Sequence, residues 1–180
     1  ISVIQPVHFK DKDTLQKLAS YKADLMLMAF VNIFVPELAR NTPKFGSICF
    51  HPSLLPLHRG PSAVNWPIIM GSEKSGFSWF YPTDGLDEGN VLLQWECPID
   101  ANDTVIDLYF KKIYPTAVDS VLEVCDLFRS GNPPHIIQDD SLATYERRCT
   151  KKHALIDWNK PVNQVYNLIR GTNPAPGAWT

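Results

Sequence analysis

Three apolar runs stand out in the first third of the chain. Residues 2–5 read as a short strand, and residues 25–30 (LMLMAF) form a continuous apolar run, as expected of a strand covered on both faces. The third run, GSICFH at residues 46–51, ends on a histidine. Because each run is short and is followed by polar or turn-forming residues, the pattern predicts three strands.

The residues between these runs carry helix signals. Asp13 can cap a helix that places Leu15 and Leu18 on one face, and Pro36 can open a short helix that continues through Arg40. Strand, helix, strand, helix and strand in this order indicate βαβ units and a parallel sheet. We therefore expect an α/β fold with a Rossmann-like, mostly parallel sheet and flanking helices.

The pattern continues beyond residue 60. Residues 62–70 read as a helix with a kink or early boundary at Pro67. Residues 76–81 and 91–96 are strand-like, with the turn-rich PTDGLDEGN between them. Helical spacing then extends over residues 104–130, where a proline divides the helix and a glycine ends it.

The character of the chain changes at residue 139. Polar segments alternate there with single apolar residues, and Asn159 and Pro161 supply the N-cap and first residue of a helix that ends near Arg170. We therefore divide the chain into a Rossmann-like domain over residues 1–138 and a linker with the start of a second domain over residues 139–180.

Composition is typical of a globular protein. The 180 residues are 44% hydrophobic and 20% charged, enough to bury a sizeable core. A net charge of −2 and a pI of about 6.2 do not indicate a nucleic-acid-binding protein. The four cysteines are widely spaced and form no zinc pattern, which predicts free thiols in a reducing compartment and no metal site.

The beginning of the chain carries no targeting signal. No basic segment precedes an apolar one, so no signal peptide is predicted, and no apolar run is long enough to cross a membrane. We therefore expect no membrane partner. The chain has no initiator methionine and opens on a predicted strand, so we expect a fragment that lacks the first units of its sheet.

His51 is the first candidate for chemistry. A lone histidine after an apolar run is more often a satisfied core residue than a catalyst. Here, however, Pro52 and Pro56 stiffen the loop that follows, and Arg59 begins a sharp, cationic turn. Open α/β sheets place their ligands at strand ends of this kind, and histidine is the side chain that titrates nearest neutrality. His51 is therefore predicted to transfer protons.

The second candidate is DGLDEG at residues 84–89. Asp and Gly are ordinary turn residues, so a simple turn is the common interpretation. The functional interpretation is that Asp87 orients an imidazole and holds a water, as a carboxylate does beside a catalytic base. The sequence gives no distance between Asp87 and His51, so their pairing depends on the expected fold.

Together these stretches resemble a known family. HPSLLPLHRG followed by GFSWFYPTDGLDEGNVLLQ is similar to the formyltransferases that use 10-formyltetrahydrofolate, whose signature is a histidine before a Ser-Leu-Leu-Pro loop and a downstream Leu-Asp-x-Gly turn. IDWNKPVNQVYNLIRGTNPAPGAWT resembles the start of that family's smaller, β-rich C-terminal domain. HPSLLPLHRGPSAVNW is most similar to the hydrolase domain of 10-formyltetrahydrofolate dehydrogenase. Methionyl-tRNA formyltransferase is also similar, and amino-sugar formyltransferase is less favoured.

The resemblance implies a mechanism. Folate binds at the carboxyl ends of the strands, and a nucleophile attacks the formyl carbon on N10. His51 stabilises the oxyanion and helps to protonate N10, while Asp87 tunes the histidine and assists proton transfer. The pterin is held by backbone groups that correspond to Asp84, Gly85 and Leu86. Elementary chemistry agrees, because an oxyanion needs donors and a departing amine needs an acid.

Cys49 departs from the pattern of the family. Its transferases usually carry an asparagine two residues before the histidine. A thiol is a weak donor, and losing an oxyanion donor costs about 10²- to 10³-fold in rate. Three interpretations stay open: a hydrolase that uses water, a transferase that is slow or uses another donor, and a catalytically weak folate-binding module. A nucleophilic role for Cys49 is disfavoured, because an apolar strand disfavours the thiolate.

The expected partners follow from the resemblance. The formyl donor is 10-formyltetrahydrofolate, tetrahydrofolate is the product, and the acceptor is water or an amine such as initiator tRNA. Arg147, Arg148, Lys151 and Lys152, the basic cluster, are expected to be solvated surface, with a contact to tRNA phosphates as the alternative. The expected location is the cytoplasm, with the mitochondrion as the alternative. The oligomeric state stays open.

Overall fold

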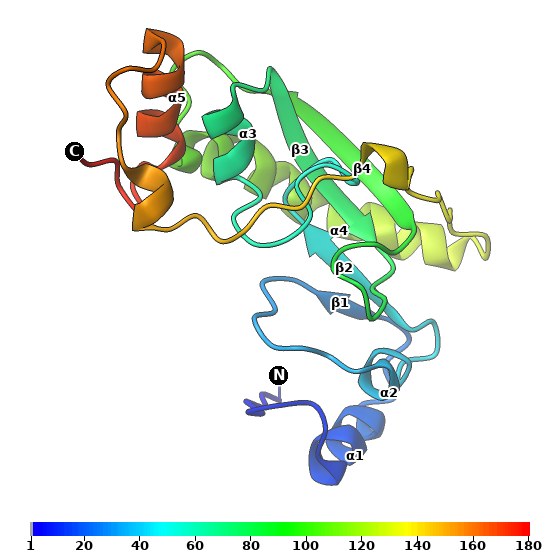
Figure 1. The fold of residues 1–180 in the computed structure, drawn as a ribbon. Coiled ribbons are helices and arrows are strands. Elements are labelled where there is room, and N and C mark those ends of the chain that lie inside the picture. The colour runs from blue at the N-terminus through cyan, green and yellow to red at the C-terminus, as the bar shows by residue number, and fades with distance from the viewer. Residues whose placement is uncertain (1) are drawn as a thin grey trace.

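Four strands form one sheet in the computed structural model, which describes residues 2–180 (Figure 1). They are β1 (Met26–Met28), β2 (Ser47–His51), β3 (Lys74–Phe80) and β4 (Val91–Pro98), and they lie in chain order. The predicted α/β class is confirmed. Within the described residues β1 and β2 pair in parallel, whereas β2–β3 and β3–β4 are antiparallel. The sheet is therefore mixed rather than mostly parallel, since the short loop between β3 and β4 allows only a hairpin.

Within residues 2–180, five α-helices accompany the sheet. They are α1 (Lys12–Ser20), α2 (Glu37–Arg40), α3 (Asn65–Met70), α4 (Tyr114–Arg129) and α5 (Val162–Gly171). A π-helical segment, Asp107–Ile113, precedes α4, and short 3₁₀ turns span Asp140–Leu142 and Lys151–Ala154. No helix within residues 2–180 has both the length and the apolar composition needed to cross a membrane.

Two local predictions at the amino end were wrong. Asp11, not Asp13, caps α1, because the Asp11 carboxylate accepts the Thr14 backbone N–H at 2.8 Å. Residues 2–5 form no strand, and a strand requires a neighbour with which to share backbone hydrogen bonds. Pro36 does precede α2 as predicted.

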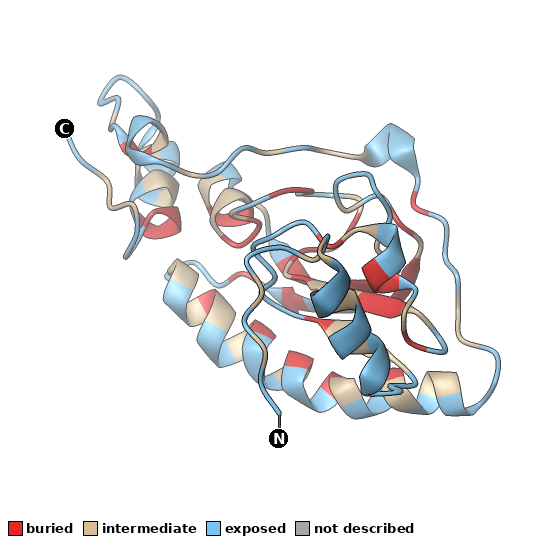
Figure 2. Ribbon diagram, turned by 90° about the horizontal axis from the view of Figure 1, so that it is seen from below, coloured by how far each residue is buried: buried red, intermediate tan, exposed pale blue. Residues whose placement is uncertain are grey.

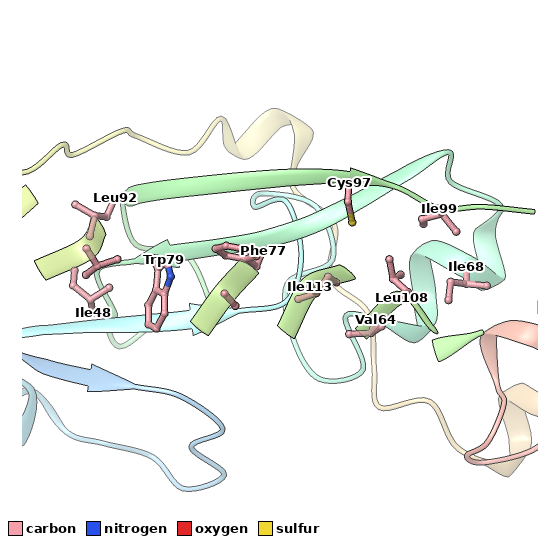
Figure 3. Packing of buried hydrophobic residues seen from close by; sticks show 12 residues of the cluster. Ile48, Val64, Ile68, Phe77, Trp79, Leu92, Cys97, Ile99, Leu108 and Ile113 are labelled. Carbon is pink, nitrogen blue, oxygen red and sulfur yellow. The ribbon is translucent and has the colours of Figure 1, made fainter. Parts of the chain in front are cut away.

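The main apolar core lies between one face of the sheet and the helical stretch formed by the π-helical segment and α4 (Figure 3). Ile48, Phe77 and Trp79 from the strands are almost fully buried there, as are Ile113 and Val124 from the helical side. Figure 2 shows α4 with buried residues on one side and exposed residues on the other. Because α4 covers one face of the sheet, a site is expected on the opposite face.

The carboxyl-terminal part packs beside α3, where α5 lies in Figure 1. The helix predicted to end near Arg170 is confirmed, but Pro161 rather than Asn159 occupies its N-cap, because the Asn159 amide bonds Asp157. Gly171 is the last residue of α5, and a Cβ there would lie 2.6 Å from Cγ1 of Ile69. The division of the chain at residues 138 and 139 stays a prediction.

Candidate functional site

β2 places Cys49 and His51 on the face of the sheet opposite α4. Side chains alternate along a strand, and Ile48 and Phe50 pack in the core on the α4 side. Cys49 therefore points the other way, where it packs against a small cluster of Leu55, Phe80 and Val91. His51 is the last residue of β2, so the predicted position at a strand end is confirmed.

The loop between β3 and β4 brings Asp87 to His51. Asp84, near the start of this loop, accepts a hydrogen bond of 2.7 Å from the Arg40 side chain. The backbone carbonyl of Arg40 accepts a hydrogen bond from the Ser47 hydroxyl at the amino end of β2. Asp87, three residues later, places Oδ2 3.6 Å from Nδ1 of His51 at the carboxyl end. The structure thus brings together the two residues whose pairing the sequence left open.

The hydrogen bond of His51 Nε2 fixes one proton of the ring and its orientation. Nε2 lies 2.8 Å from the carbonyl oxygen of His58, and a carbonyl can only accept, so Nε2 carries a proton. Nδ1 is therefore the nitrogen that faces Asp87 and is free for proton transfer. Asp87 is itself held, because its Oδ2 accepts the Gly60 backbone N–H at 2.8 Å. The two side chains are only 8% and 18% exposed.

The pair lines a cavity of about 770 Å³, a size suited to a small organic ligand. A second cavity of about 230 Å³ is lined by the predicted folate-binding residues Asp84, Gly85 and Leu86. Leu86, Asp87 and Cys49 line both, so the cavities adjoin. All six predicted site residues therefore meet at one place.

Cys49 lies on the wall shared by the two cavities. Burial, together with the negative charge of Asp87, raises the pKa of its thiol to about 12. The thiol is thus neutral near pH 7, which argues against a nucleophilic role. Its nearest hydrogen-bond acceptor is the Phe50 carbonyl at 3.8 Å, so it remains a weak donor.

Arg59 does not supply the cationic turn that the sequence suggested. Its side chain is 1% exposed, and its guanidinium bonds Gln138 at 3.1 and 2.8 Å and Asp140 at 2.7 Å. It also donates to the Tyr145 hydroxyl at 2.5 Å. The guanidinium of Arg59 is therefore hydrogen-bonded inside the fold and does not face the cavity.

Sequence reasoning missed a second buried pair beside the site. His58 Nδ1 lies 3.2 Å from Oε1 of Glu146, and their side chains are 11% and 9% exposed. Burial lowers the pKa of His58, although the charge of Glu146 opposes this shift. The sequence offers only His58 directly before Arg59 and a glutamate 88 positions after His58, which nothing in the sequence connects.

Two further predictions concern charge and metals. Of the basic cluster, Arg148 lines the larger cavity, so one cation is available at its rim. Among residues 2–180 no group of three or more His, Cys, Asp or Glu side chains could hold a metal ion.

Comparison with known proteins decides the family. Residues 2–116 match the formyl transferase family, and residues 148–180 match the formyl transferase C-terminal domain. The chain belongs to the formyl transferase family. The resemblance based on the histidine loop and the Leu-Asp-x-Gly turn is thereby confirmed.

Individual relatives of this formyl transferase family member differ in length. Human mitochondrial 10-formyltetrahydrofolate dehydrogenase is 42% identical over 169 residues, covering 94% of this chain but 18% of that protein. Methionyl-tRNA formyltransferase of Clostridioides difficile (strain 630) is 34% identical over 180 residues, covering the whole chain and 58% of that protein. The chain thus spans less than a fifth of the dehydrogenase.

A solved structure shows the same fold. HypX from Aquifex aeolicus, in complex with tetrahydrofolic acid, superimposes with a TM-score of 0.78 at 21% identity, covering 92% of this chain and 29% of HypX. At this identity the likeness concerns the fold alone. The roles of His51, Asp87 and Cys49, and folate binding by Asp84, Gly85 and Leu86, stay predictions.

Proposed function

We propose that this formyl transferase family member releases the formyl group of 10-formyltetrahydrofolate to water, as formyltetrahydrofolate hydrolases do. The observation that carries the proposal is the His51–Asp87 pair, 3.6 Å apart in the wall of a cavity of about 770 Å³. The similarity to 10-formyltetrahydrofolate dehydrogenase supports the choice of donor. The neutral thiol of Cys49, in place of an amide, supports water rather than an amine as the acceptor.

In the proposed reaction Asp87 accepts a proton from the attacking water as its oxygen bonds to the formyl carbon. His51, with protons on both nitrogens, stabilises the oxyanion through Nδ1–H. His51 then gives that proton to N10 as the bond between carbon and N10 breaks, which yields tetrahydrofolate and formic acid, and the formic acid ionises to formate in solution. Asp87 returns its proton to Nδ1, and the pair regains its starting state.

The smaller cavity is the proposed place of the pterin. Backbone groups of Asp84, Gly85 and Leu86 edge it, and apolar side chains such as Met28, Val35 and Phe80 line it. A flat heteroaromatic ring needs this combination of apolar walls and a few polar groups. Because the two cavities adjoin at Asp87, a pterin there would direct N10 toward the larger cavity.

Methionyl-tRNA is the second candidate acceptor. The family member from C. difficile aligns over the whole chain, and Arg148 lies at the rim of the larger cavity, where a phosphate could approach. A salt-sensitive reaction would be expected in that case, because phosphate contacts release counterions. The third candidate, a folate-binding module without turnover, depends on Cys49 as a weak donor.

One experiment separates the three. The purified full-length protein is incubated with 10-formyltetrahydrofolate alone, and then with methionyl-tRNA added. Formate released without an acceptor supports the hydrolase, and formyl-methionyl-tRNA supports the transferase. Tight binding of the donor with neither product would leave only the binding module.

A further inference from the structure

Gln138 lies where the two loops that carry the candidate site meet. Its side-chain oxygen accepts two hydrogen bonds from Arg59, at 3.1 and 2.8 Å. Its amide nitrogen donates to the backbone carbonyls of Asp87 at 2.8 Å and Gly89 at 2.6 Å. The residue is 8% exposed, and it lies outside both segments that match the family.

These four bonds use the full capacity of the amide. A primary amide has two N–H donors and an oxygen with two lone pairs, and each has a partner here. The partners also fix its orientation, because a guanidinium only donates and a carbonyl only accepts. Gln138 thus forms an amide bridge in which every donor and acceptor has a partner. A carboxylate of the same size cannot replace it, because a carboxylate has no N–H to donate to the two carbonyls.

The partners of Gln138 on both sides are close to His51 and Asp87. On one side, Arg59 stands between His58, whose carbonyl accepts from His51, and Gly60, whose N–H binds the Asp87 carboxylate. On the other side, Gln138 holds the carbonyl of Asp87 itself. Asp87 has a φ of 55°, a left-handed conformation that is costly for a residue other than glycine and needs support from its surroundings.

The segment that contains Gln138 is anchored independently of it. Thr144 and Glu146 form backbone hydrogen bonds of 3.0 and 3.1 Å with Arg59, and Figure 1 shows this part of the chain, in yellow, passing in front of the loop after β2. Tyr145 also donates to Glu88 at 2.9 Å. Loss of the amide bridge should therefore shift the Asp87 loop without releasing the whole segment.

We infer that Gln138 is a positioning residue that sets the separation of His51 and Asp87. The inference rests on the proposed function and deepens it, because it names the group that holds the two side chains in register for proton transfer. A displacement of about 1 Å in such a pair can cost on the order of 10²-fold in rate. Gln138 touches neither reacting group directly, so it acts only through Asp87 and the loop of Arg59.

The test uses Gln138→Glu in the full-length protein, with Gln164→Glu on the exposed side of α5 as the matched control. The carboxylate keeps its contact with Arg59 but turns an oxygen toward two carbonyls. We expect kcat for formate release to fall roughly 10- to 100-fold while KM stays within about threefold. The control should keep both values. In an Asp87→Asn background the Gln138→Glu effect should shrink to less than about threefold, because both changes act on one unit.

Several results would overturn the inference. One is an unchanged kcat in Gln138→Glu when the wild-type protein releases formate. Another is a rate loss in the double variant that equals the product of the losses in Gln138→Glu and Asp87→Asn, as a general folding defect would give. If the wild-type protein releases no formate, the proposed function fails instead, and crystal structures then decide about Gln138. A His51–Asp87 separation that is the same in Gln138→Glu and wild-type crystals would contradict the inference, and a longer one would support it.

Discussion

The two faces of the sheet use the same strands in different ways. On the α4 side, Ile48, Phe77 and Trp79 are packed almost without exposed surface, and the indole N–H of Trp79 donates a 2.8 Å hydrogen bond to Ser120. On the other side, His51 takes part in a hydrogen-bonded network beside an open cavity. Adjacent residues of β2 therefore lie in the main apolar core and beside the candidate site, because strand side chains alternate between the faces.

The position of a residue along β2 therefore predicts whether its substitution affects stability or the proposed activity. A change that faces α4 removes buried apolar contacts and should lower the free energy of unfolding. A change that faces the cavity removes a polar group from the site and should lower the rate instead.

The largest effect is expected for His51→Ala. Loss of the imidazole removes both the oxyanion donor and the acid for N10, so the rate of formate release should fall on the order of 10³-fold or more. Thermal unfolding and donor binding by calorimetry should stay close to wild type. A rate near that of the wild-type protein would remove His51 from the reaction.

Ile48→Ala tests the opposite face. The side chain is fully buried, so the free energy of unfolding measured in urea should fall by about 2–5 kcal/mol. Ile48→Val should lose only about 0.5–1.5 kcal/mol. Formate release per folded molecule should be unchanged in both variants. A selective loss of rate in Ile48→Val would show that the two faces are not separate.

Cys49→Asn tests the wall between the cavities. An amide is a stronger donor than the neutral thiol, so transfer to an amine acceptor should rise roughly tenfold or more if an oxyanion donor is missing. Cys49→Ala is the matched variant without any donor and should show no such gain. Equal rates in the two variants would mean that another group already supplies the donor.

His58→Asn should change how the free energy of unfolding depends on pH. Burial lowers the pKa of His58 in the folded protein, so the unfolded chain takes up a proton first as the pH falls below about 6.5. The free energy of unfolding should therefore fall between pH 7 and pH 5. Asn tolerates the positive φ of 58° at this position but does not titrate, so the fall in the free energy of unfolding should be smaller in the variant. Glu146 and His51, the titratable neighbours of His58, are present in both proteins. An equally steep fall would assign the effect to other groups.

Much of the fold was readable from the sequence because local signals decide it. The run ending at His51, the proline before α2 and the strand-like residues on either side of PTDGLDEGN each became the expected element. The errors arose where pairing decides the outcome. Residues 2–5 have strand-forming side chains but no ladder, and the direction of β3 depends on the strands beside it.

The site was predictable only where its residues carry a motif. His51 and Asp87 could be found from the loops that contain them, and the structure brings them together. Gln138 and Glu146 could not, because they come from a polar segment without periodicity and contact the site across long separations in sequence. Arg59 was misread for the same reason, since the residues that bury its charge lie about 80 positions further along the chain.

The most direct test of the central proposal is the rate of formate release from 10-formyltetrahydrofolate by Asp87→Asn at pH 7, measured beside the wild-type protein together with donor affinity. The asparagine keeps the size of the side chain but takes up no proton from water. We predict that the wild-type protein releases formate without an added acceptor and that Asp87→Asn is slower on the order of 10²-fold or more, with similar affinity for the donor. Equal rates in the two proteins would contradict the proposed role of the His51–Asp87 pair.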